Sequence, residues 1–295
     1  MNKLQWKKNK IAAKIQSYVL VASLTALLGL LGLLVGGGQS ALMVIGAVVI
    51  LYCFGPMVSP AFILKINSAR RLLPEEAPQL HADLRRLSAR AQLTRLPVLF
   101  CLPTDAMLAF TVGSRDHPAI ALSEGLMRRL SWQETAAVLA HEISHVRDND
   151  MRMMAFAKLA DQFTRLLSIF GQIMLLFSLP LILTGQVLMG WTAIFLLIFS
   201  PTLSSLLQLA LSRTREYNAD MGAVELMGNP EALASALAKI DRVQENLLSR
   251  FIRPMLPRIP HESWLRTHPP TKERIRRLLE VRDHLHLTHG HFRTA

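Results

Sequence analysis

Two long stretches without a charged side chain divide the chain. No Lys, Arg, Asp or Glu occurs in residues 17–64 or in residues 166–212. A helical membrane crossing takes about 20 apolar residues, so each stretch is long enough for two crossings. Turn-forming residues at 36–40 and 184–186 divide the stretches into four predicted spans, at 18–35, 41–64, 166–183 and 187–211. A cleaved signal peptide is the alternative for the N-terminus, but this apolar run is too long for one.

The polar segments carry helical and strand-like patterns. Leu80, Leu84 and Leu87 recur at helical spacing and predict an amphipathic helix over 74–93. Ser131 and Glu134 form a capping box, which opens a further helix. Three short β-prone runs separated by turn formers predict a small sheet, at 97–101, 107–112 and 118–122. Later helices are predicted at 211–227, from 230 to about 248 and, after a proline-rich loop over 254–270, at 272–284.

The formal net charge of +12 is explained by where the basic residues lie. Lys and Arg flank all four predicted spans, whereas both hairpin turns are uncharged, so the positive-inside rule places every polar segment in the cytoplasm. Basic residues beside spans also suit anionic lipid headgroups. They lack the interleaved aromatic residues of a nucleic-acid surface, so we expect no nucleic-acid partner. The chain has two cysteines, Cys53 and Cys101, which fit a reducing compartment without a disulfide.

The stretch LAHEISHVRDND at residues 139–150 carries the candidate chemistry. His141 and His145 lie one helical turn apart and can share one zinc ion, while Glu142 can act as a general base. The alternative is a helix that carries two histidines for packing or solubility. A third protein ligand would decide between them, because hydrolytic zinc sites use three protein ligands and leave a fourth position for water.

A candidate third ligand follows the second charge-free stretch, in the segment SRTREYNAD at residues 212–220. Glu216 and Asp220 are one helical turn apart, so Glu216 can bind the metal while Asp220 orients a ligand histidine. Alternatively, both carboxylates pair with Arg213 and Arg215 on a solvated helix face.

At these residues the chain resembles the HtpX family of membrane zinc metallopeptidases, relatives of the CAAX-prenyl endopeptidases. The resemblance covers most of the chain, including AIALSEGLMRRLSWQETAAVLAHEISH, the second hairpin and THPPTKERIRRL. It implies one Zn²⁺ per chain held by His141, His145 and Glu216, with Glu142 as catalytic base and Asp220 in support. It also implies a protease that removes damaged membrane proteins under stress.

The expected fold is therefore mainly α, with four transmembrane helices in two hairpins and a cytoplasmic, zincin-like α+β catalytic domain containing a small sheet. We expect a multi-pass protein of the plasma (inner) membrane with both termini in the cytoplasm. The expected segments are a basic N-terminus (1–16), hairpin 1 (17–64), a first catalytic part (65–165), hairpin 2 (166–211), a second catalytic part (212–283) and a histidine-rich tail (284–295).

One departure from the family concerns substrate binding. Family members usually carry an Asn-Ala-Phe-Ala-Thr-Gly strand, whereas this chain has LAFTVG at residues 108–113, with Leu108 in place of the asparagine. The strand could still add an extended substrate chain at its edge. Arg213 could hold Asp220 or serve as a membrane anchor, and His268 could bind substrate, stabilise the oxyanion or have a structural role. The tail histidines 284, 286, 289 and 291 could bind metal adventitiously.

Three other functions compete with a quality-control protease that acts on unfolded membrane proteins. One is a processing peptidase for a defined peptide, such as a lipidated one. The second is a catalytically silent zinc-binding membrane scaffold, although a structural site has no use for Glu142 as a base. The third is a transporter, against which stands the lack of ionisable residues in the hairpins.

Overall fold

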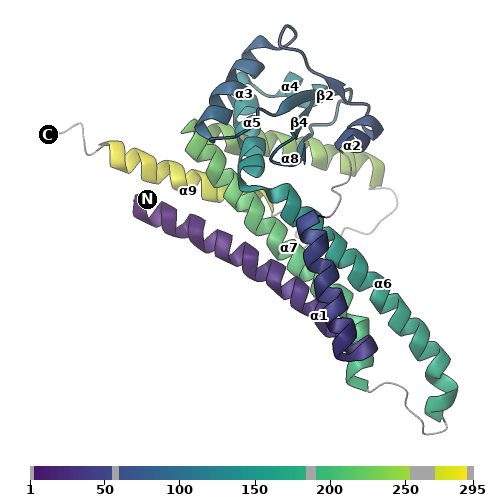
Figure 1. Ribbon diagram of the computed structural model, residues 1–295. Helices are drawn as coiled ribbons and strands as arrows, with labels where there is room; N and C mark the ends of the chain where they lie inside the picture. Colours follow the sequence, from purple (N-terminus) through teal and green to yellow (C-terminus); the bar gives the residue numbers. More distant parts are fainter. Residues whose placement is uncertain (1–2, 55–59, 184–190, 253–269, 291–295) are drawn as a thin grey trace. The chain divides into compact units, whose positions relative to one another are not determined.

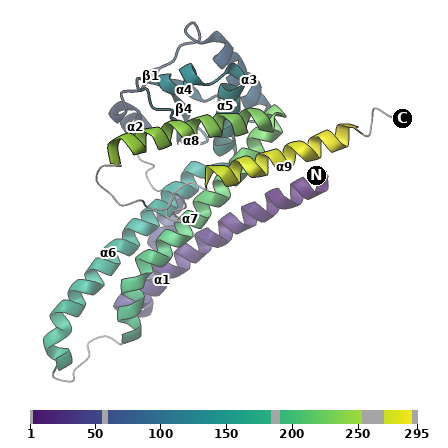
Figure 2. The same cartoon turned by 180° about the vertical axis from the view of Figure 1, so that it is seen from behind.

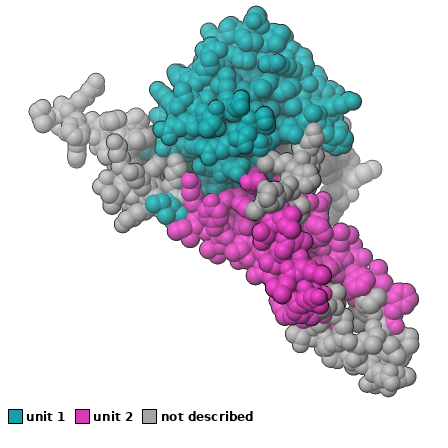
Figure 3. All heavy atoms as spheres, viewed as in Figure 1, with its two compact units in different colours: residues 1–13, 57–151, 213–295 teal, residues 14–56, 152–212 magenta. Residues whose placement is uncertain are grey.

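A computed structural model describes residues 3–54, 60–183, 191–252 and 270–290 (Figure 1). The chain divides into two compact units, and each combines segments that are distant in the sequence (Figure 3). Unit 1 comprises residues 1–13, 57–151 and 213–295, whereas unit 2 comprises residues 14–56 and 152–212. Unit 2 therefore contains most of both charge-free stretches, and unit 1 contains most of the polar segments.

The first helix of unit 2 reverses direction inside the glycine-rich segment. Helix α1 is assigned over Lys3–Phe54, but Gly37 has a positive φ of 74°, and the chain turns back on itself there (Figure 1). The two arms approach closely through small residues, since a Cβ added at Gly32 would lie 3.0 Å from the Val44 side chain. The turn predicted at 36–40 is thus confirmed, because glycine adopts this backbone conformation without steric cost.

A second helix pair completes unit 2. Helices α6 (Asp150–Leu183) and α7 (Trp191–Met227) are linked by Asp161, whose carboxylate accepts hydrogen bonds from Arg165 and from Ser205 at 2.9 Å each. Gly171 also lets the Leu197 side chain approach closely. The turn predicted at 184–186 lies outside the described residues.

Two helical stretches among the described residues are long and apolar enough to cross a membrane. They are Ile11–Leu34 and Ile194–Met227, and Gly37–Ile50 is a shorter apolar helix. Many large apolar side chains of unit 2 are exposed, including Leu42 at 72% and Phe177 at 72%. Such a surface is typical of a segment that contacts lipid or protein rather than water.

Unit 1 contains a four-stranded mixed sheet. Its strands are β1 (Arg70–Arg71), β2 (Val98–Leu102), β3 (Ala109–Gly113) and β4 (Pro118–Ser123), in the order β1-β2-β4-β3. Strands β2 and β4 are parallel, and the other two pairs are antiparallel. Strand β3 therefore forms one edge of the sheet. The three strands predicted from the β-prone runs are confirmed, whereas β1 is too short to produce a pattern.

Helices cover both faces of this sheet. They are α2 (Pro60–Ile66), α3 (Pro78–Arg90), α4 (Glu124–Arg129), α5 (Trp132–Asp148), α8 (Pro230–Ile252) and α9 (Thr271–Gly290). The face that carries Leu99, Ile120 and Leu122 packs into the main core with α3, α5, α8 and α9. The opposite face packs against Leu64 of α2. Helices α8 and α9 lie side by side (Figure 2).

Several element boundaries differ from the sequence prediction. Helix α3 begins at Pro78 rather than Pro74, because the Glu76 carboxylate accepts a hydrogen bond from the Leu73 amide and holds residues 74–77 in a turn. Helix α4 was not predicted, although Ser123 caps its first turn. Helix α9 extends to Gly290 rather than ending at residue 284. The proline-rich loop over 254–270 lies almost entirely outside the described residues.

Candidate metal centre

Helix α5 carries the two histidines of the motif inside the core of unit 1. Its N-terminus has the predicted capping box, in which the Ser131 side chain accepts from the Glu134 amide and the Glu134 carboxylate accepts from the Ser131 amide at 2.7 Å. Glu134 also accepts from Ser235 at 2.6 Å and Lys239 at 2.7 Å, both on α8. The start of the histidine helix is therefore fixed both locally and by α8.

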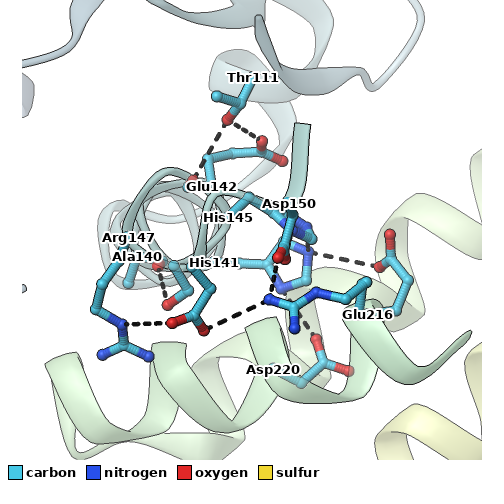
Figure 4. Close-up of polar contacts among 12 residues, drawn as sticks. Thr111, Ala140, His141, Glu142, His145, Arg147, Asp150, Glu216 and Asp220 are labelled. Atoms are coloured by element: carbon cyan, nitrogen blue, oxygen red, sulfur yellow. Dashed lines mark hydrogen bonds and ion pairs between the residues drawn. The ribbon is translucent and has the colours of Figure 1, made fainter. Parts of the chain in front are cut away.

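One turn of α5 separates His141 from His145, and the two rings face the same space. The Nε2 atoms are 3.1 Å apart, and the rings meet edge to face with centroids 4.7 Å apart (Figure 4). Helix α7 brings Glu216 to the same place, with its Oε2 3.6 Å from the His141 Nε2. One potential ligand atom from each of the three residues lies within 4.8 Å of the other two.

The other ring nitrogen of His141 is held from α7 and α9. Asp220 Oδ1 lies 3.0 Å from His141 Nδ1. Arg274 of α9 donates two hydrogen bonds to the Asp220 carboxylate, at 2.8 and 2.6 Å, and its Nη1 lies 3.0 Å from Glu216 Oε2. All four side chains are largely buried. Arg274 thus binds two carboxylates at once, that of Asp220, which contacts His141, and that of Glu216.

His145 is held by a different carboxylate. Helix α5 ends with Asn149 in the left-handed conformation, at φ 57°, and α6 begins at the next residue. This reversal brings the Asp150 carboxylate back to His145 Nδ1, at 2.8 Å (Figure 4). Asp150 in turn forms an ion pair with Arg215, the residue next to Glu216 on α7.

Both histidines are more basic than usual. Burial alone would lower the pKa of His141, but hydrogen bonds to Asp220 and Glu216 outweigh it and raise that pKa to about 10. Burial also opposes protonation of His145, yet the hydrogen bond to Asp150 raises its pKa. The pKa of Asp220 is lowered, since Arg274 and His141 outweigh the burial of its carboxylate. The site therefore attracts positive charge.

The geometry fits a divalent metal ion. A carboxylate beside each Nδ1 favours a proton on that atom, so Nε2 is the ring atom that each histidine would offer to a metal, on the side of the Glu216 carboxylate. Ligands of a tetrahedral zinc ion, each about 2.1 Å from the metal, lie about 3.4 Å from one another. The Nε2–Nε2 distance of 3.1 Å and the Nε2–Oε2 distance of 3.6 Å are close to this value. Two histidines and one carboxylate are also a donor set that zinc commonly takes.

The Glu142 side chain points from α5 toward strand β3 of the sheet. Its Oε2 accepts a hydrogen bond of 2.6 Å from the Thr111 hydroxyl, whose residue lies in the edge strand β3 (Figure 4). Thr111 pairs with Ile120 of β4, so both side chains project from the face of the sheet that packs on α5. A carboxylate suited to general-base chemistry thus lies between the histidines and a sheet edge.

The structure describes only some of the remaining candidates. Arg213 is half-buried on α7, and the guanidinium that pairs with Asp220 is that of Arg274. Leu108 is 39% exposed immediately before β3, and its amide donates to Ser123 Oγ at 2.9 Å. His268 and His291 lie outside the described residues. The segment with the other tail histidines, 284, 286 and 289, continues α9 as a helix.

Sequence reasoning missed several residues at the site. Arg274 stands within the THPPTKERIRRL segment that carried the family resemblance, but nothing in the helical pattern singled it out. Asp150 follows His145 by five residues, which does not place it on the same face of a helix, and Thr111 lies on a strand 31 residues before Glu142. Helical spacing therefore gave no signal for either residue. Arg215 was expected to flank a membrane span or to pair with nearby carboxylates on a solvated helix face, whereas it is 2% exposed.

Comparisons with known proteins give a consistent result. A family model described as Peptidase family M48 matches residues 74–282. A protein named "Protease HtpX homolog" from Acaryochloris marina is 34% identical, with 91% of this chain and 92% of that protein covered. Another of the same name from Desulforapulum autotrophicum is 32% identical, with 90% and 89% covered. The crystal structure of S. mikatae Ste24p aligns with a TM-score of 0.50 at 22% identity, over 92% of this chain and 66% of that one, and so resembles it in fold.

Proposed function

Because this chain belongs to peptidase family M48, and within it to the HtpX proteases, we propose that it is a membrane-anchored zinc endopeptidase that cleaves misfolded or damaged membrane proteins. The single observation that carries the proposal is the convergence of His141, His145 and Glu216, whose ligand atoms lie within 4.8 Å of one another. Glu142 follows the first of them directly. A structural zinc site would not need this fourth group.

In the proposed mechanism, His141, His145 and Glu216 hold the zinc ion. Zinc, when bound, supplies Lewis-acid chemistry, because it lowers the pKa of a water molecule and polarises a peptide carbonyl. Glu142 accepts a proton from the attacking water and delivers it to the leaving amine. The Thr111 hydroxyl, 2.6 Å from Glu142 Oε2, fixes the orientation of that carboxylate.

Asp220 and Arg274 complete the proposed machinery. Asp220 keeps the Nδ1 proton on His141, so that Nε2 remains free to bind the metal. Arg274 keeps both Asp220 and Glu216 in place and offsets the negative charge that they bring into the core.

The position of strand β3 supports an extended polypeptide as the substrate. Strand β3 pairs with β4 on one side, and its other side is the edge of the sheet within the described residues. Thr111 connects this edge directly to Glu142. A substrate chain added along the edge would be bound through its main chain, which gives affinity with little sequence preference. Unfolded proteins offer such chains, and folded ones do not.

The proposed setting is the plasma (inner) membrane. Four spans, at 18–35, 41–54, 166–183 and 187–211, would anchor the protein through the exposed apolar surface of unit 2. The second is shorter than the 41–64 expected from the sequence, because Leu64 of α2 packs against the sheet of unit 1. The basic residues beside these spans favour a cytoplasmic catalytic domain and cytoplasmic termini. An anchored protease of this kind has access to damaged membrane proteins, which fits a role in quality control and stress.

The test compares purified wild-type protein with Glu142→Gln in detergent, with zinc added. Substrates are an unfolded test protein, the same protein folded, and a prenylated peptide. We expect the wild type to cleave the unfolded protein and Glu142→Gln to be slower by a factor of about 10²–10⁴, because general-base catalysis contributes that much. Glu280→Gln, an exchange at an exposed position on α9, is the matched control and should cleave normally.

Other outcomes would favour the competing functions. Cleavage of the prenylated peptide alone would indicate a processing peptidase. Zinc binding by the wild type without cleavage of any substrate would indicate a scaffold.

A further inference from the structure

The second metal-facing histidine is held by a group beyond the HEISH motif. The Asp150 carboxylate lies 2.8 Å from His145 Nδ1, and Asp150 is 3% exposed. It reaches the ring only because Asn149 adopts the left-handed conformation and reverses the chain between α5 and α6. His145 is therefore oriented by the first residue of the next helix rather than by a residue of its own helix.

The same carboxylate is tied to the helix that carries Glu216. Arg215 forms an ion pair with Asp150, and its guanidinium also lies 3.8 Å from Asp148. Its side chain is 3% exposed and that of Asp150 is 4% exposed. Because Arg215 and Glu216 are consecutive on α7, one short segment contributes to both sides of the candidate site. Glu216 faces the histidines directly, whereas Arg215 contacts Asp150 on the Nδ1 side of His145.

We propose that Asp150 and Arg215 form a bridge that positions His145 for metal binding and couples its orientation to that of Glu216. This inference rests on the proposed metal ligands. Asp150 accepts a hydrogen bond from the Nδ1–H of His145, which fixes both the tautomer and the rotation of the ring. Arg215 holds Asp150 against the ring. The contacts from His145 to Asp150 and from Asp150 to Arg215 then connect α5 to α7 through a metal ligand.

A packing role alone does not account for this pair. Burying two charged groups costs several kcal/mol per ion before they attract each other, and apolar side chains of the same volume often stabilise a core equally well. Helices α5 and α7 already have another polar link, since Arg147 Nη1 donates to Glu225 Oε2 at 3.1 Å. That link does not reach a histidine ring. The Asp150–Arg215 pair, in contrast, ends on the proposed ligand His145, as the Arg274–Asp220 pair ends on His141.

The test uses four variants of the full chain: Asp150→Asn, Arg215→Met, the double variant, and Asp161→Asn as control. Asp161 is a matched control because it is a buried aspartate that accepts a hydrogen bond from an arginine, far along α6 from the histidines. All variants and the wild-type reference carry alanine at tail positions 284, 286, 289 and 291, so that zinc binding reports on one site. Zinc dissociation constants are measured by competition with a chelator, and Co²⁺-substituted protein gives a visible absorption spectrum.

We expect each single variant to raise the zinc dissociation constant by about 10- to 100-fold, as loss of an outer partner of a ligand does. The zinc dissociation constant of the double variant should not exceed the larger of the two single-variant values, since both substitutions break the same bridge. The Co²⁺ spectrum should change in both single variants, because the geometry around the ion changes. Asp161→Asn should leave the affinity and the spectrum as in the reference.

Unchanged zinc affinity and Co²⁺ spectra in both single variants would overturn the proposal, even if their unfolding temperatures fall, and would reduce the pair to a structural role. Additive losses in the double variant would also overturn it, because Arg215 would then act separately from Asp150. If Arg215→Met does not fold, Asp150→Asn with its near-identical volume decides alone. Failure of the wild-type reference to bind zinc would instead refute the proposed function.

Discussion

Gly222 offers the sharpest test of how α7 is placed against the histidine helix. It lies less than two helical turns after Glu216 and faces Ser144, the residue just before His145 on α5. A Cβ added at Gly222 would contact the Ser144 Oγ and would lie 2.8 Å from the Ser144 Cβ and 2.7 Å from an Arg147 nitrogen. Ser144 is completely buried, so it has no space to move into.

The expected displacement follows from ordinary contact distances. Carbon atoms pack at about 3.5–4.0 Å, so in Gly222→Ala the two helices must separate locally by about 0.7–1.2 Å. Distances from a metal to its ligands tolerate only about 0.2 Å. Glu216 would therefore be drawn away from His141 and His145, and zinc affinity should fall by at least the roughly 10- to 100-fold typical of losing an outer partner. Overpacking costs about 1–3 kcal/mol, against a helix-propensity gain of about 0.5–1 kcal/mol for alanine.

The assay is chelator competition in the background without tail histidines, combined with cleavage of the unfolded test protein and thermal unfolding followed by circular dichroism. Gly46→Ala is the matched control, because a Cβ added at that helical glycine meets nothing within 4 Å. The double variant Gly222→Ala with Ser144→Gly removes both contacting Ser144 atoms and should recover most of the zinc affinity. Wild-type affinity in Gly222→Ala, with no loss of stability, would refute the close contact between α5 and α7.

Three further predictions concern the surroundings of the site. Burial raises the pKa of Glu134, but hydrogen bonds from α8 and from its own helix cap outweigh burial and lower that pKa to about 2. The ionised Glu134 therefore stabilises the fold fully above about pH 4.5, and this stabilisation is lost as the pH falls toward 2. The stability difference between wild type and Glu134→Gln, at most about 3 kcal/mol, should therefore shrink over that range in thermal unfolding; a constant difference would contradict the pKa. Thr111→Val should lower kcat about 2- to 10-fold without changing zinc affinity, since one hydrogen bond to Glu142 is lost; steady-state kinetics would show an unchanged kcat if the hydroxyl is irrelevant. Arg274→Met removes the arginine partner of the buried Asp220 carboxylate and leaves it only the contact with His141, so the metal-free protein should be destabilised by about 3–5 kcal/mol, and an unchanged unfolding midpoint would exclude the pairing.

Features that depend on neighbouring residues could be predicted well. The capping box at Ser131 and Glu134 was correctly predicted, because it involves side chains three residues apart. The spacing of His141 and His145 indicated a shared face, and the rings do meet at 3.1 Å between their Nε2 atoms. The reversal near Gly37 was also visible, since a run of three glycines interrupts an apolar stretch.

Glu216 could be predicted only in part from the sequence. Helical spacing linked it to Asp220, and the family resemblance implied a ligand role. The same residues fitted a solvated face paired with Arg213 and Arg215. Only the structure brings Glu216 Oε2 to 3.6 Å from His141 Nε2, across a chain separation that contains the whole second hairpin. Its role as a ligand remains a proposal, and its place beside the histidines is a finding.

The sequence by itself determined most of the long helices, the cap that opens α5, and that two histidines and a glutamate lie within about one helical turn, because those properties depend on residues within a few positions of one another. The tertiary structure alone decided what surrounds that turn. Non-sequential strand order makes β3 an edge and brings Thr111 to Glu142. Packing of α9 brings Arg274 to Asp220, and the left-handed Asn149 turns Asp150 back to His145. These contacts depend on how distant segments fill a common core, and no local pattern of side chains records that packing.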